Sequence, residues 1–251
     1  RFTINIKFTR TIGWRMKYKN SLIFLCGGTL ISPNFVLTAA HCSSQTKNYS
    51  VRRKPEIVRL GTRNIQKYSN GVTDVKIKRF LHNPRWKPPS RYNDIALIEL
   101  AKAVQFSKFI QPACLAGHYP GKYNATITGW GITEKTSKTL SSVLQSAEVD
   151  IIDSEDCNSL LKRYWSRNWC GMEEHQMCAG KIDGSVDTCL GDSGGPLQVK
   201  LQETRKEGTM HMVIGVTSFG FSCGGKGKPG IYTRVSSFLD WIESTVWPQK
   251  F

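Results

Sequence analysis

The chain has 251 residues, 39% hydrophobic and 22% charged, which is typical of a globular protein and excludes a disordered one. Its longest apolar stretch, residues 22–31, is interrupted by Cys26 and two glycines, so nothing approaches the roughly 20 apolar residues of a membrane span, and we expect none. The net charge of +16 is spread along the chain, which favours a cationic surface over a nucleic-acid-binding segment, and we expect no nucleic-acid partner.

The predicted secondary structure consists mainly of short strands. The expected strands are residues 22–25, 35–38, 56–60, 72–77, 95–100, 125–128, 146–151, 196–201, 210–216 and 230–235. Turn signals rich in Gly, Pro, Asn and Ser separate them. Many short strands with this punctuation predict β-barrels or a sandwich, and therefore an all-β protein.

Helical patterns are few. Residues 153–164 predict a short helix, and helical periodicity is clear near the C-terminal end, where Ser237 and Asp240 match a capping box that precedes an apolar face. A Gly- and Pro-containing stretch at residues 116–122 interrupts the strand pattern. It predicts a boundary between two lobes.

Eight cysteines are present, without a Cys-x-x-Cys pair and without a His pair at zinc spacing. Disulfides in an oxidising compartment are the better interpretation, and we expect a secreted, extracellular protein. Asn48 and Asn124 begin acceptor triplets for N-glycosylation, which supports a glycoprotein. The chain begins at Arg1 without a secretory signal, so we expect a processed chain or a fragment.

The sharpest chemical signal is Ser193, within the Gly-Asp-Ser-Gly-Gly-Pro sequence of residues 191–196. A nucleophilic serine needs an exposed hydroxyl on a tight turn with backbone N–H groups nearby. A Gly-rich turn without chemistry is one alternative. The nucleophile elbow of α/β-hydrolases is another, but that fold orders its triad Ser, acid, His. Here only His211 follows Ser193, after the loop acids Glu203 and Glu207, so this alternative fits poorly.

The reverse chain order fits better. His41 follows an apolar strand, and Asp94 begins another. Either residue alone would more often be structural. Together with Ser193 they provide a nucleophile, a base to take its proton and a carboxylate to orient the base.

With these motifs the sequence resembles the chymotrypsin-like serine endopeptidases of the trypsin family. The resemblance spans about residues 12–247 and depends on residues 26–31, 37–42, 93–100, 127–131, 187–196 and 229–233. It implies two packed antiparallel six-stranded β-barrels with a C-terminal α-helix. The implied ranges are about 1–115 for the first barrel, 122–236 for the second and 237–247 for the helix. The segment at residues 235–242 is also similar to the clip-domain proteases of arthropods, which act in proteolytic cascades.

The resemblance implies a role for each candidate residue. Ser193 would be the nucleophile, His41 the general base and acid, and Asp94 the orienting carboxylate. The N–H groups of Gly191 and Ser193 would form the oxyanion hole. The mechanism would proceed through an acyl-enzyme, without a cofactor.

Specificity is also implied by the resemblance. Asp187 would lie at the base of the primary pocket, where a carboxylate selects Arg or Lys. Gly220 and Gly230 would form open pocket walls. The segment that begins at Ser218 would pair with substrate backbone as an added strand.

The family pattern implies three disulfides: Cys26–Cys42, Cys157–Cys178 and Cys189–Cys223. A further family bridge is lost, because Ala125 and Val199 occupy its positions. Cys114 matches the position that tethers a pro-region in many family members. Cys170 would pair with another chain, pair with Cys114 or stay free.

The resemblance further implies activation from a zymogen, in which a new amino terminus pairs with the acid before the nucleophile, here Asp192. No Ile-Val-Gly-Gly start is present, so the amino-terminal activation segment is expected to be missing. Calcium-loop carboxylates are not evident in residues 61–74, so no metal is expected.

The leading hypothesis is a secreted endopeptidase that cleaves after Arg or Lys. Its expected partners are protein substrates, an upstream activating protease and serpin-type inhibitors. A catalytically silent homologue or zymogen-locked fragment with a binding role is the alternative, although all three triad residues are present. A cationic binder of heparin-like polymers or nucleic acid is the third hypothesis.

Overall fold

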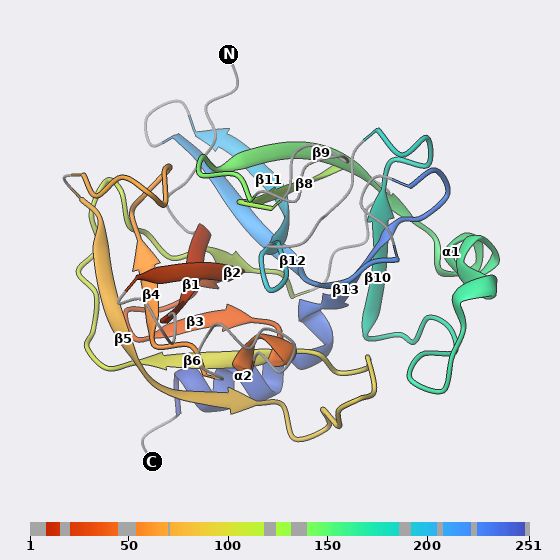
Figure 1. Ribbon diagram of the computed structural model, residues 1–251, viewed down its shortest axis with the longest axis horizontal. Helices are drawn as coiled ribbons and strands as arrows, with labels where there is room; N and C mark the ends of the chain where they lie inside the picture. Colours follow the sequence, from red (N-terminus) through yellow and green to blue (C-terminus); the bar gives the residue numbers. More distant parts are fainter. Residues whose placement is uncertain are drawn as a thin grey trace.

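The computed structural model describes residues 9–15, 21–44, 54–69, 71–117, 124–131, 140–185, 192–204, 208–221 and 225–248. A first group of strands forms a closed antiparallel barrel, in the order β1-β2-β3-β6-β5-β4 (Figure 1). Its members are β1 (Thr9–Arg15), β2 (Leu22–Leu30), β3 (Phe35–Thr38), β4 (Ile57–Leu60), β5 (Thr73–His82) and β6 (Ala96–Leu100).

The second barrel has the order β11-β8-β9-β10-β13-β12 and is closed by pairing between β11 and β12. Its members are β8 (Asn124–Gly129), β9 (Gln145–Ile152), β10 (Gln176–Gly180), β11 (Pro196–Thr204), β12 (Gly208–Phe219) and β13 (Gly230–Arg234). The short strand β7 (Cys114–Leu115) adds a parallel pairing to β12. The predicted fold of two six-stranded barrels is therefore confirmed.

All ten predicted strands are present, several of them longer than expected. The sequence analysis missed β1, β7 and β10. In β1 only Ile12 and Trp14 are large and apolar, and both are fully buried. In β10 the polar Gln176 is buried, where its amide oxygen accepts a hydrogen bond from Trp169 Nε1 at 3.1 Å. These strands depend on partners distant in sequence more than on their own apolar pattern.

The helix predicted at residues 153–164 is present as α1 (Ser154–Leu161), followed by the 3-10 helix η2 (Lys162–Tyr164). Asp153 caps it, since its carboxylate accepts a hydrogen bond from the N–H of Glu155 at 2.8 Å.

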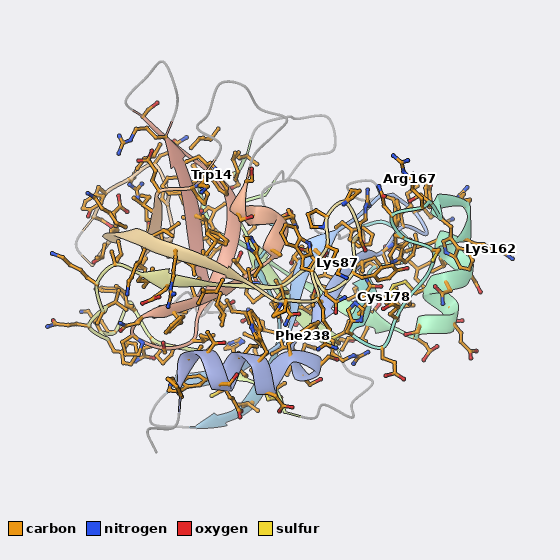
Figure 2. All side chains as sticks on the ribbon, turned by 90° about the horizontal axis from the view of Figure 1, so that it is seen from below. Trp14, Lys87, Lys162, Arg167, Cys178 and Phe238 are labelled. Atoms are coloured by element: carbon orange, nitrogen blue, oxygen red, sulfur yellow. A yellow bond between two sulfur atoms is a disulfide. The ribbon has the colours of Figure 1, made fainter. Side chains whose placement is uncertain are left out.

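The C-terminal helix α2 (Leu239–Val246) lies against the first barrel, below it in Figure 1. Phe238 and Ile242 enter the core of that barrel, and Phe238 is labelled beside the helix in Figure 2. The predicted capping box was wrong: the 3-10 helix η3 (Val235–Phe238) already contains Ser237, and α2 has no side-chain cap. No helix in the described part of the chain is long and apolar enough to cross a membrane.

The two barrels are fixed to each other by a shared apolar cluster. Its buried members are Phe24, Ile57, Ile65, Trp130 and Leu144. Polar contacts reinforce it, because Trp130 Nε1 and the N–H of Leu144 both donate to the carbonyl of Arg63, at 3.2 and 2.7 Å. A rigid junction of this kind can hold side chains from both barrels in one site.

The structure contains the disulfides Cys26–Cys42 and Cys157–Cys178. Cys114 and Cys170 are exposed free thiols, in β7 and in the loop before β10. Cys189 and Cys223 lie outside the described residues, so their pairing stays a prediction.

Candidate active site

His41 and Asp94 are joined by two hydrogen bonds. His41 lies in the 3-10 helix η1 (Ala40–Ser43), which follows β3, and Asp94 lies two residues before β6. The Nδ1 of His41 is 2.7 Å from Oδ2 of Asp94, and the backbone N–H of His41 donates to Oδ1 at 3.0 Å. The imidazole therefore has a fixed orientation, with Nε2 free to face a reactant.

Asp94 is buried at the junction of the barrels, with 4% of its surface exposed. Its carboxylate accepts a second hydrogen bond on Oδ2, from Oγ of Ser218 in β12 at 2.5 Å. Its backbone carbonyl accepts one from Oγ1 of Thr233 in β13 at 2.9 Å. Two hydroxyl groups of the second barrel thus hold Asp94 of the first, one at its carboxylate and one at its backbone carbonyl.

The chain turns sharply just before Asp94. Asn93 has φ of 55°, in the left-handed region that asparagine tolerates better than most residues. Its N–H donates to Nε2 of His175 at 3.0 Å. This contact anchors the turn that delivers Asp94 to the site.

The pKa values of the pair move apart. Burial lowers the pKa of His41, and the charge of Arg91 acts in the same direction, but the charge and hydrogen bond of Asp94 outweigh both and raise it. Burial alone would raise the pKa of Asp94, but the charge of His41 and the hydrogen bonds from His41 and Ser218 lower it. Asp94 therefore stays ionised and favours the protonated imidazole.

The backbone of Ser193 and the imidazole of His41 both approach the sulfur of Cys42. The carbonyl of Ser193 accepts a hydrogen bond from the N–H of Gly27 at 2.7 Å. The same carbonyl oxygen is 3.6 Å from Sγ of Cys42, and that sulfur is 3.9 Å from Nε2 of His41. Residues 41, 94 and 193, remote in sequence, are thus gathered at one place.

Gly194 fits tightly between the two barrels. Its φ is 78°, and a Cβ added there would lie 2.2 Å from Oγ1 of Thr38 and 2.6 Å from the carbonyl of Gly27. Only glycine combines this conformation with this close approach. The residue after the serine therefore fixes the segment against the strand that leads to His41.

The carboxylate of Asp192 lies in a cradle made by Gly129 and Gly131. The N–H of Gly131 donates to Oδ1 of Asp192 at 2.8 Å. A Cβ on Gly129 or Gly131 would come within 1.9 or 2.2 Å of the carboxylate oxygens. Gly129, Trp130 and Gly131 belong to the motif at residues 127–131, and the two glycines make room for the carboxylate of Asp192.

Asp187 of the predicted specificity pocket and Gly191 of the predicted oxyanion hole lie outside the described residues. Gly220 has no atom within 4 Å of where its Cβ would be, and Gly230 is the buried first residue of β13. The hydroxyl of Ser218 donates to the carboxylate of Asp94. Beside it, the guanidinium of Arg91 lies 4.6 Å from the ring centre of Phe219.

A metal cluster is not supported by the donors near His41. The ligand atoms of Cys26, His41 and Cys42 lie within 4.8 Å of one another, but the two sulfurs are joined in a disulfide and are not thiolates. In the loop where a calcium site was considered, the carboxylate of Asp74 is bound by Nε and Nη2 of Arg59, both at 2.7 Å.

Sequence reasoning missed Thr233, Asn93 and His175. Thr233 and His175 are ordinary strand and loop residues in the sequence, without a local signal for a contact with residues 93–94. Asn93 immediately precedes Asp94, and its tolerance of positive φ was the one signal that could have marked the turn.

The trypsin family model matches residues 7–242, which include both barrels and all the site residues above. The chain belongs to the trypsin family. The resemblance inferred from the motifs is confirmed by this match.

The proteins similar to this chain include three from arthropods. The chain is 38% identical to the serine protease Hayan of Drosophila melanogaster over 236 residues, and 38% identical to the serine protease snk of the same species over 226. These alignments cover 92% and 89% of this chain but only 36% and 49% of the relatives. The beta subunit of clotting factor G of Tachypleus tridentatus is 34% identical over 237 residues, covering 90% of this chain and 72% of that protein.

Proposed function

We propose that this chain is the catalytic domain of a serine endopeptidase, with Ser193, His41 and Asp94 as its triad. The observation that carries the proposal is the 2.7 Å contact between Nδ1 of His41 and Oδ2 of Asp94. Sγ of Cys42 lies 3.9 Å from Nε2 of His41 and 3.6 Å from the carbonyl oxygen of Ser193, which supports a place for Ser193 near that nitrogen. An oriented imidazole next to a serine in a Gly-Asp-Ser-Gly-Gly sequence is the arrangement that activates a hydroxyl group.

In the first half of the reaction, Oγ of Ser193 attacks the carbonyl carbon of a substrate peptide bond, and Nε2 of His41 takes the hydroxyl proton. The N–H groups of Gly191 and Ser193 stabilise the negative oxygen of the tetrahedral intermediate. His41 then gives the proton to the leaving amine, and the C–N bond breaks to leave an acyl-enzyme. In the second half a water molecule attacks the ester, again with His41 as base, and Ser193 is released.

Asp94 does not take the proton in this scheme. Its charge stabilises the imidazolium that forms at each step, and its hydrogen bond keeps the proton on Nδ1 so that Nε2 can accept. The hydroxyl of Ser218 and the N–H of His41 donate hydrogen bonds to this carboxylate. These bonds offset the free energy that burying a charged group requires.

We propose that cleavage follows Arg or Lys. This depends on Asp187, six positions before the nucleophile, as the charged floor of the primary pocket. The open space beside Gly220 supports a pocket wall that does not obstruct a long side chain. Replacement of Asp187 by Ser should remove the preference for Arg and Lys over neutral residues, and an unchanged preference would refute the assignment.

We also propose a secreted zymogen-derived protein that acts in a proteolytic cascade. The disulfides, the exposed Asn124 and the relation to a clotting-factor subunit support this setting. Asp192 would receive the ammonium group of the activated amino terminus within its glycine cradle. The exposed Cys114 suits a disulfide to a pro-region. An upstream protease would activate the protein, and serpin-type proteins would inhibit it.

The test is hydrolysis of a small Arg-amide substrate by the complete, activated protein. The Ser193→Ala variant should lose hydrolysis almost entirely, while Ser244→Ala in α2 serves as a control. Activity that survives Ser193→Ala would remove Ser193 from its role. A folded, activated protein that does not hydrolyse the substrate would instead support the catalytically silent homologue.

A further inference from the structure

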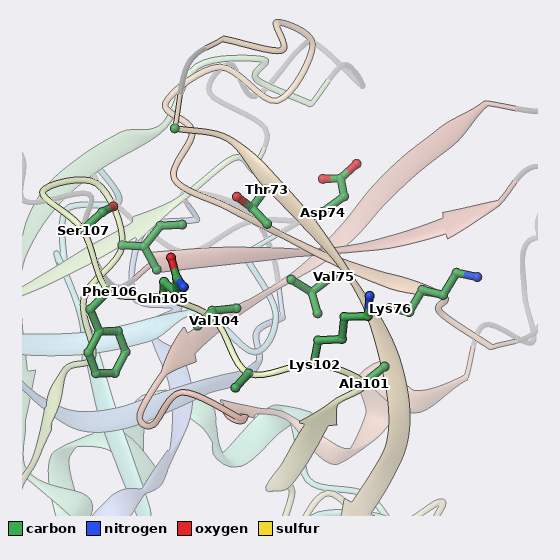
Figure 3. Close-up of a pocket in the computed structure, with 13 residues that line it drawn as sticks. Thr73, Asp74, Val75, Lys76, Ala101, Lys102, Val104, Gln105, Phe106 and Ser107 are labelled. Atoms are coloured by element: carbon green, nitrogen blue, oxygen red, sulfur yellow. The ribbon is translucent and has the colours of Figure 1, made fainter.

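A groove lies on the first barrel, between the first half of β5 and the segment of residues 101–110 (Figure 3). Its volume is about 690 Å³. The floor is apolar and buried, and is formed by Val75, Val104 and Ile110. None of the proposed catalytic or specificity residues lines it.

The rim of the groove is positively charged. Lys76 and Lys102 line it and are exposed, and neither has a carboxylate within 4.0 Å among the described residues. In Figure 3 the side chain of Lys102 lies beside Val75 over the groove. Two ammonium groups without a carboxylate partner in the described part of the chain flank an apolar floor. They give the rim an unbalanced positive charge, which favours a negatively charged ligand.

Among the described residues that line the groove, the acidic one is Asp74, and its charge is already paired. Arg59 binds both carboxylate oxygens of Asp74 at 2.7 Å. Figure 3 shows the side chain of Asp74 directed away from Val104 and Gln105. Asp74 therefore does not balance Lys76 and Lys102.

The backbone of β5 offers a strand edge to the groove. The carbonyl of Lys76 accepts a hydrogen bond from the N–H of Ala101 at 2.8 Å, whereas the N–H of Ile77 donates to Glu56 on the side of β4 at 2.9 Å. Because successive residues of a strand direct their backbone groups to opposite edges, Asp74 shares the edge of Lys76 and faces the groove. An extended peptide can add to such an edge.

Exposed aromatic side chains extend the apolar surface. Phe106 in the lining is 48% exposed, and Phe109 next to it is 42% exposed. Phe109 packs on Gly71, where an added Cβ would come within 2.4 Å of its ring. Lys108 lies 5.1 Å from the ring centre of Phe109, adding a further cation. Contiguous exposed apolar surface of this kind marks interaction sites.

We propose that this groove binds an extended, acidic segment of a partner protein that carries alternating apolar side chains. The apolar side chains would cover Val75, Val104 and Ile110, and the acidic ones would pair with Lys76 and Lys102. The segment would lie along the edge of β5 at Asp74, beyond the hydrogen bond between Lys76 and Ala101. The proposal goes beyond the peptidase activity, because it concerns a surface that binds without cleaving.

The test uses a fluorescein-labelled peptide of sequence Glu-Phe-Glu-Leu-Glu-Leu-Glu, which contains no Arg or Lys. Fluorescence anisotropy with the full chain at about 0.15 M salt should show saturable binding. Charge reversal in the Lys76→Glu/Lys102→Glu variant should weaken Kd about tenfold or more, since two attractive pairs become repulsive. Ala103→Trp, which fills the groove without a change of charge, should weaken binding similarly.

The matched control is the Lys162→Glu/Arg167→Glu variant, whose side chains lie at the opposite end of the molecule in Figure 2. It should leave Kd within about twofold, because charges beyond a Debye length are screened. Hydrolysis of a small Arg-amide should be unchanged in the groove variants, which separates this surface from the active site.

Three outcomes would overturn the proposal. The first is the absence of saturable binding. The second is equal affinity for a peptide with serine at the apolar positions, or for a heparin oligosaccharide, since either would indicate a general polyanion surface. The third is an equal loss of affinity in the control variant.

Discussion

The two halves of the active site are held in different ways. The half from the first barrel, His41 and Asp94, is fixed by side-chain hydrogen bonds, one of them from Ser218 of the second barrel. The half from the second barrel, around Ser193, is fixed by a backbone hydrogen bond to Gly27 and by the close fit of Gly194. The first half is therefore sensitive to a change of charge or hydrogen bonding, and the second to the addition of a single carbon.

The largest effect is expected from Asp94→Asn. The neutral amide cannot stabilise the imidazolium and can donate to Nδ1, which favours the wrong tautomer of His41. The known loss for this change in the serine-protease mechanism is about 10⁴-fold in kcat. Kinetics on an Arg-amide substrate measure it, with Asp240→Asn on the exposed face of α2 as the control. A loss below about 10²-fold would mean that the carboxylate is not the orienting group.

A smaller effect is expected from Gly194→Ala, which tests the second half. The added Cβ would collide with Thr38 and Gly27, and φ of 78° is unfavourable for alanine. Ser193 should shift by up to about 1 Å, and kcat/KM should fall by about 10²-fold. Gly117→Ala is the matched control, because its Cβ would meet nothing within 4 Å. Equal kinetics for the two variants would contradict the close fit.

Removal of each disulfide in turn should show whether the stability of the fold and the activity of the site depend on the same contacts. Removal of Cys157–Cys178 by alanine substitution should lower the free energy of unfolding by about 3 kcal/mol, measured by urea denaturation, with kcat/KM preserved. Removal of Cys26–Cys42 should cause a similar loss of stability and also lower kcat/KM, because Sγ of Cys42 contacts both His41 and Ser193. Parallel activity losses in both variants would show that the site depends on global stability alone.

The smallest effect concerns pH. His41 must be neutral to accept the proton of Ser193, so kcat/KM rises with pH as His41 loses its own proton. The charge of Arg91 lowers the pKa of His41. Arg91→Ala should therefore raise this pKa and move the acid limb of the kcat/KM profile to higher pH. Arg91→Lys keeps the charge and should leave the limb in place, and a limb that moves equally in both variants would exclude an electrostatic cause.

Much of the site could be predicted from the sequence because the trypsin-family motifs are local. The Gly-rich segment around Ser193, the His41 segment and the Asp94 segment are each recognisable within a few residues. The support of Asp94 could not be predicted in the same way. The hydroxyl of Ser218 donates to a carboxylate 124 positions away, and the hydroxyl of Thr233 donates to the carbonyl of Asp94 across 139 positions. The pairing of the segment that begins at Ser218 with substrate backbone stays a prediction.

The two α-helices also show where the local sequence predicts the structure and where it does not. A short helix was predicted at residues 153–164, and it is present as α1 with Asp153 as its cap. The capping box at Ser237 was wrong, because the burial of Phe238 in the first barrel accompanies an earlier 3-10 turn that already contains Ser237. Local propensity was overruled where packing between distant segments mattered more.

The sequence by itself determined the all-β class and most strand positions, and it supplied the proposed nucleophile, base and acid, since alternation and short motifs act over a few residues. Only the tertiary structure decided how β1 and β10 close their barrels, which hydroxyl groups donate to Asp94, and where an apolar floor lies beside Lys76 and Lys102. The physical reason is that hydrogen bonds and burial between remote segments depend on how the barrels close and dock, and no local pattern encodes that arrangement.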